Sequence, residues 1–261
     1  MDKSYLDIFI CSHKPFQQRV KNDCYRILSV GGSTLLNGEN ILKDDVNINC
    51  MNVSHFYSEL SGYYWIWKNY QVKEYIGFCH YRRYFDFFDN IPNMDKEAYD
   101  IILPTPSYFF MGVYNQYKQC HNVDDINSII DILRDDFNVP QEIINSEIIN
   151  STKAYCYNMF ITKRELFYDY CEFIFGVLET YLQKHNFNNM NDIYSHISLN
   201  KEKYLKGKYP SNDIKYQCRI GGFLSERLMG VWVKLRNLRV KEVDVIETEV
   251  KYKEKRNNDF V

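Results

Sequence analysis

The chain has 261 residues, of which 45% are hydrophobic, a formal net charge of −2 and an isoelectric point near 6.3. This length and composition suit one α/β domain with a sizeable core. The lack of a basic excess argues against a general nucleic-acid binder, and the sequence has no run of about 18 uncharged apolar residues that would span a membrane.

The cysteines and the N-terminus predict a cytoplasmic protein. None of the eight cysteines belongs to a C-x-x-C pair, so we expect free thiols in a reducing compartment rather than a zinc ribbon. The first residues lack the basic segment and apolar run of a signal peptide. Aromatic residues make up 16% of the chain, which suits sugar and base recognition and equally fits a biased genome.

The first predicted strand, Leu6–Cys11, is followed by a turn that carries Ser12, His13 and Lys14. In a nucleotide-binding α/β fold, the turn after the first strand is the first place to expect a base or phosphate contact. An ordinary proline-containing turn with exposed polar side chains explains the same residues. A helix is predicted over residues 16–28.

Two polar turns follow. Gly31 and Gly32 allow a ligand to approach the backbone closely, but the pattern around them is neither G-x-G-x-x-G nor a P-loop, which gives no support to a Rossmann dehydrogenase or a Walker NTPase. Asp44 and Asp45 are weak metal-ligand candidates, and solvated loop acids are the commoner explanation of such a pair.

The stretch from residue 59 to residue 85 organises the chain. Apolar residues at i, i+3, i+4 and i+7 predict a helix over residues 59–69, with Ser54 as its N-cap. A short buried strand is predicted over residues 75–79. The segment HYRRY, residues 80–84, comes at its end, where α/β proteins bind ligands. Because Arg82 and Arg83 are costly to bury without an anionic partner, the segment is either a site or a surface.

The rest of the chain alternates helical and strand patterns, and no repeat or linker divides it. We predict a turn at 91–93, a strand at 99–103, helices at 114–138 and 141–150, a strand at 154–161, a helix at 163–183, an Asn- and Lys-rich excursion at 184–215 and a last helix at about 223–240. The domain is expected to cover residues 1–240, followed by an exposed charged tail at 241–261.

The last helix has a leucine-rich stripe and basic residues elsewhere on its surface. A basic amphipathic helix can lie on an anionic membrane surface. Packing of the stripe on the parent domain is the commoner outcome.

Two long motifs resemble a known family. Residues 59–69 read ELSGYYWIWKN and residues 75–85 read YIGFCHYRRYF. They are similar to the ELTGLYWIWKN and YIGLCHYRRYF signatures of a bacterial capsular and exopolysaccharide biosynthesis family, catalogued as a domain of unknown function. The stretches 12–15, 158–161 and 219–228 fit the same pattern, so the resemblance spans nearly the whole chain.

Members of that family are taken to be glycosyltransferases. The resemblance implies a three-layered α/β fold with a mostly parallel sheet of the GT-A-like nucleotide-sugar transferase type. It also implies a UDP-sugar donor, with a galactose form leading, and a growing capsular, exopolysaccharide or O-antigen saccharide as acceptor. The acceptor would be lipid-linked and met at the inner face of the cell membrane.

Such a transfer needs a cradle for the nucleotide, neutralisation of the departing diphosphate and activation of an acceptor hydroxyl. No Asp-x-Asp is present to hold Mg²⁺ or Mn²⁺, and Glu242-x-Asp244 is the nearest approach. We therefore expect the basic groups of the HYRRY segment to take over part of the metal's role. The alternative is that one arginine pairs structurally with Asp86 or Glu59, and a metal requirement stays open.

The candidate residues fall into three groups. Catalytic candidates are Glu226 as proton acceptor, because the resemblance places it in a motif, with Asp125 and His121 as rivals, and His80. Candidates for donor and diphosphate binding are Ser12, His13, Lys14, Gly31, Gly32, Arg82, Arg83 and Arg219. Candidates for acceptor or sugar contact are Glu59, Tyr81, Tyr84, His121 and Asn158.

A different class of function uses the same segment. Arginine and aromatic side chains also hold single-stranded nucleic acid, so the HYRRY segment is compatible with a non-catalytic module for anionic ligands. The short basic cluster, the net negative charge and the family resemblance favour the enzyme, and no nucleic-acid partner is expected.

Overall fold

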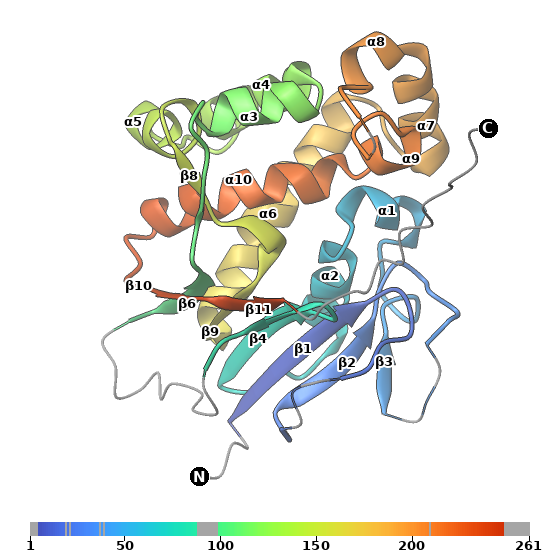
Figure 1. Cartoon of the computed structure of the whole chain (residues 1–261), viewed down its shortest axis with the longest axis vertical. Helices are drawn as coiled ribbons and strands as arrows, with labels where there is room; N and C mark the ends of the chain where they lie inside the picture. The colour runs from blue at the N-terminus through green and yellow to red at the C-terminus, as the bar shows by residue number, and fades with distance from the viewer. Residues whose placement is uncertain are drawn as a thin grey trace, which may run out of the picture.

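The computed structural model describes residues 5–18, 20, 22–36, 38, 40–87, 99–208 and 210–247. Their central feature is a mixed, mostly parallel sheet in the order β10-β6-β9-β4-β1-β2-β3, with β5 beside β4 and β11 beside β5 (Figure 1). The strands are β1 (Leu6–Ser12), β2 (Tyr25–Ser29), β3 (Ile41–Lys43), β4 (Tyr75–His80), β5 (Arg83–Phe85), β6 (Ile101–Pro104), β9 (Phe160–Lys163), β10 (Val240–Val243) and β11 (Val245–Glu247).

The strand directions create a switch point between β1 and β4. β1 pairs in parallel with both β2 and β4, β2 with β3, and β6 with β10, whereas β9 is antiparallel to β4 and β6. After β1 the chain builds outward through β2 and β3, and it returns to the other side of β1 as β4. Ligands of open α/β sheets bind outside the carboxyl ends of the strands at such a point.

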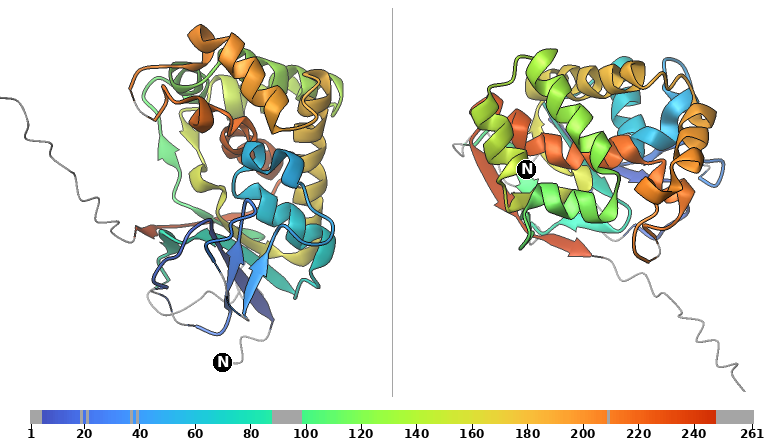
Figure 2. Two further views of the ribbon diagram at one scale, coloured as in Figure 1. Left: turned by 90° about the vertical axis from the view of Figure 1, so that its right-hand side faces the viewer. Right: turned by 90° about the horizontal axis from the view of Figure 1, so that it is seen from above.

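The helices lie on one side of this sheet (Figures 1 and 2). They are α1 (Ser54–Tyr57), α2 (Leu60–Asn69), α3 (Val113–Cys120), α4 (Val123–Asp135), α5 (Gln141–Ile144), α6 (Arg164–Lys184), α7 (Met190–Leu199), α8 (Lys201–Tyr204), α9 (Ile214–Gln217) and α10 (Ile220–Leu235). A small second sheet pairs β7 (Ser107–Tyr108) with β8 (Lys153–Ala154), and short 3₁₀ or π turns lie at η1 (Met51–Val53), η2 (Asn145–Ile149) and η3 (Cys156–Asn158).

The larger core lies between the sheet and these helices. Alternate strand residues such as Phe9 and Phe78 point into it, where the Tyr63 ring of α2 stacks on Phe78 with centroids 3.8 Å apart. The strand residues between them, Leu6, Ile8 and Ile10 among others, form a second cluster on the opposite face. The α/β class with a mostly parallel sheet is therefore confirmed, and the period of two predicted for buried strands accounts for the two clusters.

A third layer of helices is not seen among the described residues. The opposite sheet face is packed by β5, β11 and the irregular segment after β1, including Phe16 and Val20. The predicted helix at 16–28 is wrong because Asn22 forms a turn: its side chain accepts a hydrogen bond from the Cys24 N–H and its carbonyl from that of Tyr25. The chain then enters β2.

The helices at 59–69, 141–150 and 163–183 were predicted within a few residues of α2, α5–η2 and α6. The single helix predicted at 114–138 is instead two, because His121 is extended and the Asn122 side chain caps α4 by accepting from the Asp124 N–H. The 184–215 excursion contains α7, whose capping box joins Asn189 to Asp192. The predicted strand at 154–161 is interrupted by η3.

Some predicted boundaries also change. Ser54 is the first residue of α1 rather than the cap of α2, because Ser58, at a positive φ of 55°, separates the two helices. The last helix begins and ends earlier than predicted, and residues 240–247 continue as strands of the main sheet rather than as the tail expected from residue 241. The predicted turn at 91–93 lies outside the described residues.

Helix α10 is a core helix. Of its predicted stripe, Leu224, Leu228 and Val231 are fully buried and Leu235 and Leu238 are half-buried, and Arg227 is buried as well. The basic residues that follow, Arg236 and Arg239, are paired with Asp169 and Asp100. The apolar stripe therefore packs largely on the parent domain. Among the described helices, none combines the length and the apolarity required to cross a bilayer.

Candidate active site

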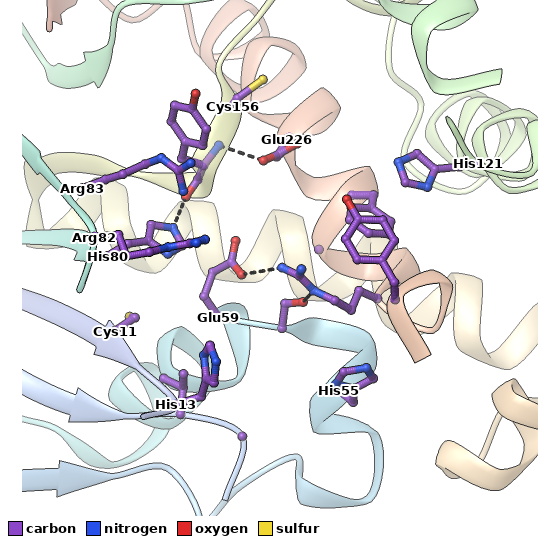
Figure 3. A pocket seen from close by; sticks show the side chains of 18 of the residues that line it. Cys11, His13, His55, Glu59, His80, Arg82, Arg83, His121, Cys156 and Glu226 are labelled. Carbon is purple, nitrogen blue, oxygen red and sulfur yellow. Dashed lines mark hydrogen bonds and ion pairs between the residues drawn. The ribbon is translucent and has the colours of Figure 1, made fainter. Parts of the chain in front are cut away.

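A cavity of about 760 Å³ lies at the switch point of the sheet, between the carboxyl ends of β1 and β4 and the helices above them (Figure 3). Its sheet side is lined by Cys11, His13, Gly31, His80, Tyr81, Arg82 and Arg83, and its helical side by Phe109, His121, Tyr157, Tyr216, Arg219, Phe223, Glu226 and Arg227. The volume is within the range of sites for small ligands.

Basic groups gather on the sheet side of the cavity. His80 is the last residue of β4, Arg82 lies in the turn that follows, and Arg83 is the first residue of β5, which positions all three at the strand end. Burial lowers the pKa of His13, and the nearby charges of Lys14, Arg219, Arg82 and His80 lower it further. These groups share one positive field, which favours an anionic ligand.

Arg83 and Arg219 are held in place by protein partners that leave them lining the cavity. Arg83 donates from Nε to Glu247 Oε1 at 2.8 Å, and its guanidinium lies 4.2 Å from the centre of the Tyr157 ring. Arg219 donates to Ser58 Oγ at 2.6 Å and lies 3.6 Å from the Glu59 carboxylate. The arginine that pairs with Glu59 is therefore Arg219. Arg83 pairs instead with Glu247 of β11, which lies in the segment that was expected to be a tail.

Two carboxylates face these cations. Glu59 precedes α2, and its Oε1 accepts a 2.7 Å hydrogen bond from Asn158 Nδ2. Glu226 projects from α10 and accepts from the Tyr157 N–H at 2.8 Å and from Arg227 Nη1 at 2.8 Å. Burial raises the pKa of Glu226, while Arg227 and the Tyr157 N–H lower it by stabilising the carboxylate. A buried carboxylate with a raised pKa is a candidate proton acceptor.

The His121 ring lies in the wall of the cavity. Its ring is 5% exposed, stacks on Phe223 with centroids 4.0 Å apart and meets Gln217 Oε1 through Nδ1 at 3.0 Å. Burial lowers its pKa to about 3, so the ring is neutral and only weakly basic. It lines the cavity as part of an aromatic wall with Phe223 and Tyr216.

The structure brings most of the candidates together. Glu226, His80, His13, Gly31, Arg82, Arg83, Arg219, Glu59, Tyr81 and His121 all line the cavity. Ser12, Lys14, Gly32, Asp44, Asp45, Tyr84, Asp125 and Asn158 are not among its lining residues. The roles of both groups stay predictions.

Asp125 lies in the helical core, away from the cavity. Its Oδ1 accepts hydrogen bonds from the hydroxyls of Tyr181 and Tyr204, and the side chain is 1% exposed. Burial raises its pKa to about 7. Since no substrate reaches this carboxyl group, a catalytic role has no support from its position.

Several other candidate residues lie outside the cavity lining and make hydrogen bonds or packing contacts within the protein. Asp44 accepts from the Gly31 and Gly32 N–H groups at 2.7 and 3.1 Å and from Ser61 Oγ at 2.5 Å, so its carboxylate holds the glycine turn. Ser12 binds the Lys14 carbonyl. Tyr84 packs with Phe85 in the cluster on the opposite sheet face. Asn158 is 1% exposed and acts through Glu59.

The positions of Asp44 and Asp45 do not support the weak hypothesis of a metal site. Asp44 is buried beneath the glycine turn whereas Asp45 is exposed, and within the described ranges no three His, Cys, Asp or Glu side chains are grouped closely enough to hold an ion. Glu59 and Glu226 already accept hydrogen bonds from protein donors. The donor set is that of an anion site rather than of a preformed cation site.

Sequence reasoning missed several lining residues, among them Tyr157, His55, Gln116 and Arg227. Tyr157 has a positive φ of 76°, which no local signal predicts for a tyrosine. His55 binds the Lys215 carbonyl from α1, and Gln116 accepts a short hydrogen bond from Arg227. Of these four residues, only Arg227 had a signal in the sequence, because it follows Glu226 within the stretch 219–228 that resembles the family.

The comparisons with known proteins agree with this architecture. A family model described as a domain of unknown function (DUF4422) matches residues 7–199. The apo structure of the bifunctional glycosyltransferase WbbM has a similar fold, with a TM-score of 0.72 and 21% identity, covering 94% of this chain and 45% of that chain. This chain thus spans less than half of WbbM, and no curated protein matches it. Because the family model covers most of its residues, the chain belongs to the DUF4422 family.

Proposed function

We propose that this protein is a glycosyltransferase that moves a sugar from a nucleotide-diphosphate donor to a saccharide acceptor. The observation that carries the proposal is the cavity at the switch point, where basic groups on the strand ends face Glu59 and Glu226. The similarity in fold to a protein named as a bifunctional glycosyltransferase supports it. The α/β fold by itself hosts many activities, so the proposal rests on the site.

The donor binds against the strand ends. The glycine turn and His13 lie beside the carboxyl end of β1 and are placed to meet the nucleoside, while Arg82, Arg83 and His80 meet the diphosphate. Arginine grips phosphate oxygens with parallel, charge-assisted hydrogen bonds. As the bond between the sugar C1 and the phosphate oxygen breaks, negative charge grows on the diphosphate, and fixed positive groups lower the free energy of that state.

The acceptor hydroxyl is activated by Glu226. Its oxygen forms the new bond to the sugar C1, and its proton passes to the Glu226 carboxylate. The pKa of Glu226 is raised toward neutral pH, which makes its carboxylate a better proton acceptor. No step of this scheme passes through a metal ion, and the basic groups supply the neutralisation that Mg²⁺ or Mn²⁺ would supply.

The finer identity of the substrates comes from the family resemblance. It points to a UDP-sugar, with a galactose form first, and to a lipid-linked capsular, exopolysaccharide or O-antigen saccharide presented at the inner face of the membrane. The competing module for single-stranded nucleic acid has less support, because the basic cluster is short and the chain has a net charge of −2.

Calorimetric titration with UDP, in the presence and absence of Mn²⁺, tests the proposal. Wild type is expected to bind UDP without metal. The double variant Arg82→Ala/Arg83→Ala is expected to bind at least about 100-fold more weakly, since each charge-assisted hydrogen bond contributes about 1.5–3 kcal/mol. Release of UDP from UDP-galactose then measures turnover.

Arg239→Ala is the matched control, because this arginine is exposed, paired with Asp100 and absent from the cavity lining. It should bind UDP as wild type does. Binding that requires Mn²⁺ would overturn the cation scheme, and binding of single-stranded nucleic acid in place of any nucleotide would favour the binding module.

A further inference from the structure

Two consecutive residues at the cavity wall have backbone conformations that residues with side chains rarely adopt. Tyr157 has φ 76° and ψ −2°, and Asn158 has φ 52°. A left-handed conformation costs a residue with a Cβ about 1–2 kcal/mol, and asparagine tolerates it better than tyrosine. Such a conformation persists only where the surroundings over-determine it.

The surroundings of Tyr157 are the reacting groups of the site. Its N–H donates to Glu226 Oε1 at 2.8 Å, and its carbonyl accepts from His80 Nε2 at 2.6 Å. Its ring lies under the Arg83 guanidinium. Because the carbonyl can only accept, His80 carries a proton on Nε2. One backbone unit thus holds both the proposed base and the Nε2–H of the imidazole.

Asn158 extends the same network to the other carboxylate. Its Nδ2 donates to Glu59 Oε1 at 2.7 Å and its Oδ1 accepts from Ser225 Oγ at 2.9 Å. Its carbonyl accepts a short hydrogen bond from the hydroxyl of Tyr63. With 1% of its surface exposed, Asn158 does not reach a ligand in the cavity.

We propose that Tyr157 and Asn158 are positioning residues that couple the donor side of the site to its base. Rotation of either residue out of the left-handed region would remove the hydrogen bonds of Glu226, His80 and Glu59 together. The three groups are therefore placed correctly in one state and misplaced in another, rather than adjusted one by one. This inference rests on the proposed function and assigns these residues a role in positioning the groups of the same site.

The left-handed backbone at position 157 would favour glycine, and the ring contact that Tyr157 makes with Arg83 explains why a tyrosine is found there. Glycine would relieve the backbone strain, but it would remove the ring beneath Arg83. Tyr157→Gly is thus expected to leave the melting temperature unchanged or higher while turnover falls. A residue with a purely structural role would show the reverse.

Asn158→Gly, compared with Asn186→Gly, is the decisive pair of variants. Asn186 is also left-handed, with φ 55°, but it is exposed and remote from the cavity lining. Glycine keeps both backbones unstrained and removes only the amide group. We expect Asn158→Gly to lower kcat for UDP-sugar turnover by about 10- to 100-fold, with the UDP dissociation constant within about threefold of wild type, and Asn186→Gly to change neither.

A second measurement does not depend on activity. In ¹⁵N-histidine NMR spectra of this chain, which has six histidines, wild-type His80 should show a hydrogen-bonded Nε2–H. That hydrogen bond should persist in Asn158→Gly, which keeps the left-handed backbone, and should be lost in Asn158→Val, whose β-branched side chain disfavours it. A His80 Nε2–H that is unchanged in Asn158→Val, or a UDP affinity that falls in parallel with kcat in Asn158→Gly, would overturn the coupling. A wild type that releases no UDP from any donor would refute the proposed function, and the His80 signal would still decide the coupling.

Discussion

Two buried carboxyl groups, Glu226 and Asp125, have raised pKa values for the same reason, which is the loss of solvent around the charged form. Their surroundings separate their roles. Glu226 is 20% exposed at the cavity wall and is hydrogen-bonded as a carboxylate. Asp125 has no access to the cavity, and its Oδ2 has no hydrogen-bond partner among the described residues. The difference allows the two groups to be tested separately.

Glu226→Gln is expected to abolish sugar transfer while UDP binding persists, because the amide keeps the shape but takes no proton. In wild type the rate should rise with pH as Glu226 loses its proton, with a midpoint above the ordinary value for glutamate. Steady-state rates from pH 5 to 9 measure this. Glu172→Gln, an exposed site on α6, is the control, and a Glu226→Gln enzyme with wild-type turnover would exclude Glu226 as the base.

Asp125→Asn is expected to stabilise the fold at neutral pH. The folded pKa of about 7 exceeds the ordinary 3.8, so the fold favours the protonated form. The stability from this group is complete below pH 3.8 and is lost as the pH rises through 7. The advantage of the variant should grow by up to about 1.4 kcal/mol per pH unit in that window. Urea denaturation at pH 5, 6 and 7.5 measures it, and a constant difference would contradict the assignment.

At the scale of elements, α10 connects the core to the site. Its first turn packs so closely on α1 that Gly221 and Gly222 have no room for a Cβ: one at Gly221 would lie 2.5 Å from the Phe56 ring. The same helix then presents Arg219 and Glu226 to the cavity and buries Trp232 beside Tyr170 of α6. Close packing at its start is what sets the position of Glu226.

Two glycines of α10 should respond to alanine in opposite ways. Gly221→Ala is expected to destabilise the protein by about 1–3 kcal/mol through overpacking against Phe56. Gly230→Ala would meet only the flexible end of Glu147, 3.0 Å away, and should stabilise the helix by up to about 1 kcal/mol. Chemical denaturation of both variants checks the pair, and equal destabilisation would contradict the packing explanation.

At the scale of the whole molecule, the last described strands complete the site. β10 pairs with β6 and β11 with β5, and the carboxylate of Glu247 holds Arg83 from 164 residues away in sequence. An edge strand and a surface ion pair contribute little stability by themselves. Their contribution is to orient a cation of the proposed diphosphate site.

Removal of β11 is therefore expected to affect binding more than folding. A chain that ends at Val243 should bind UDP more weakly than one that ends at Glu247, while the melting temperatures differ little. Glu247→Gln in the full chain should weaken UDP binding in the same direction. If both truncated chains bind UDP equally, β11 has no part in orienting Arg83.

The elements that were predicted well have strong local signals. α2, β4 and α6 follow clear periods of 3.6 or 2, and they carry or adjoin the motifs that identify the family. The segment at 16–28 and the break at His121 were missed because single asparagines, Asn22 and Asn122, start a turn and cap a helix there. Such side-chain hydrogen bonds compete with periodicity and leave little trace in it.

The sequence by itself determined the α/β class and the basic segment at a strand end, because periodicity and strand termini are local properties of the chain. Only the tertiary structure decided which acids face that segment. It joins Asn158 to Glu59 across 99 residues and Tyr157 to Glu226 across 69, and it buries Asp125 among tyrosines. Such contacts depend on how helices pack on the sheet, which the spacing of residues along the chain does not specify.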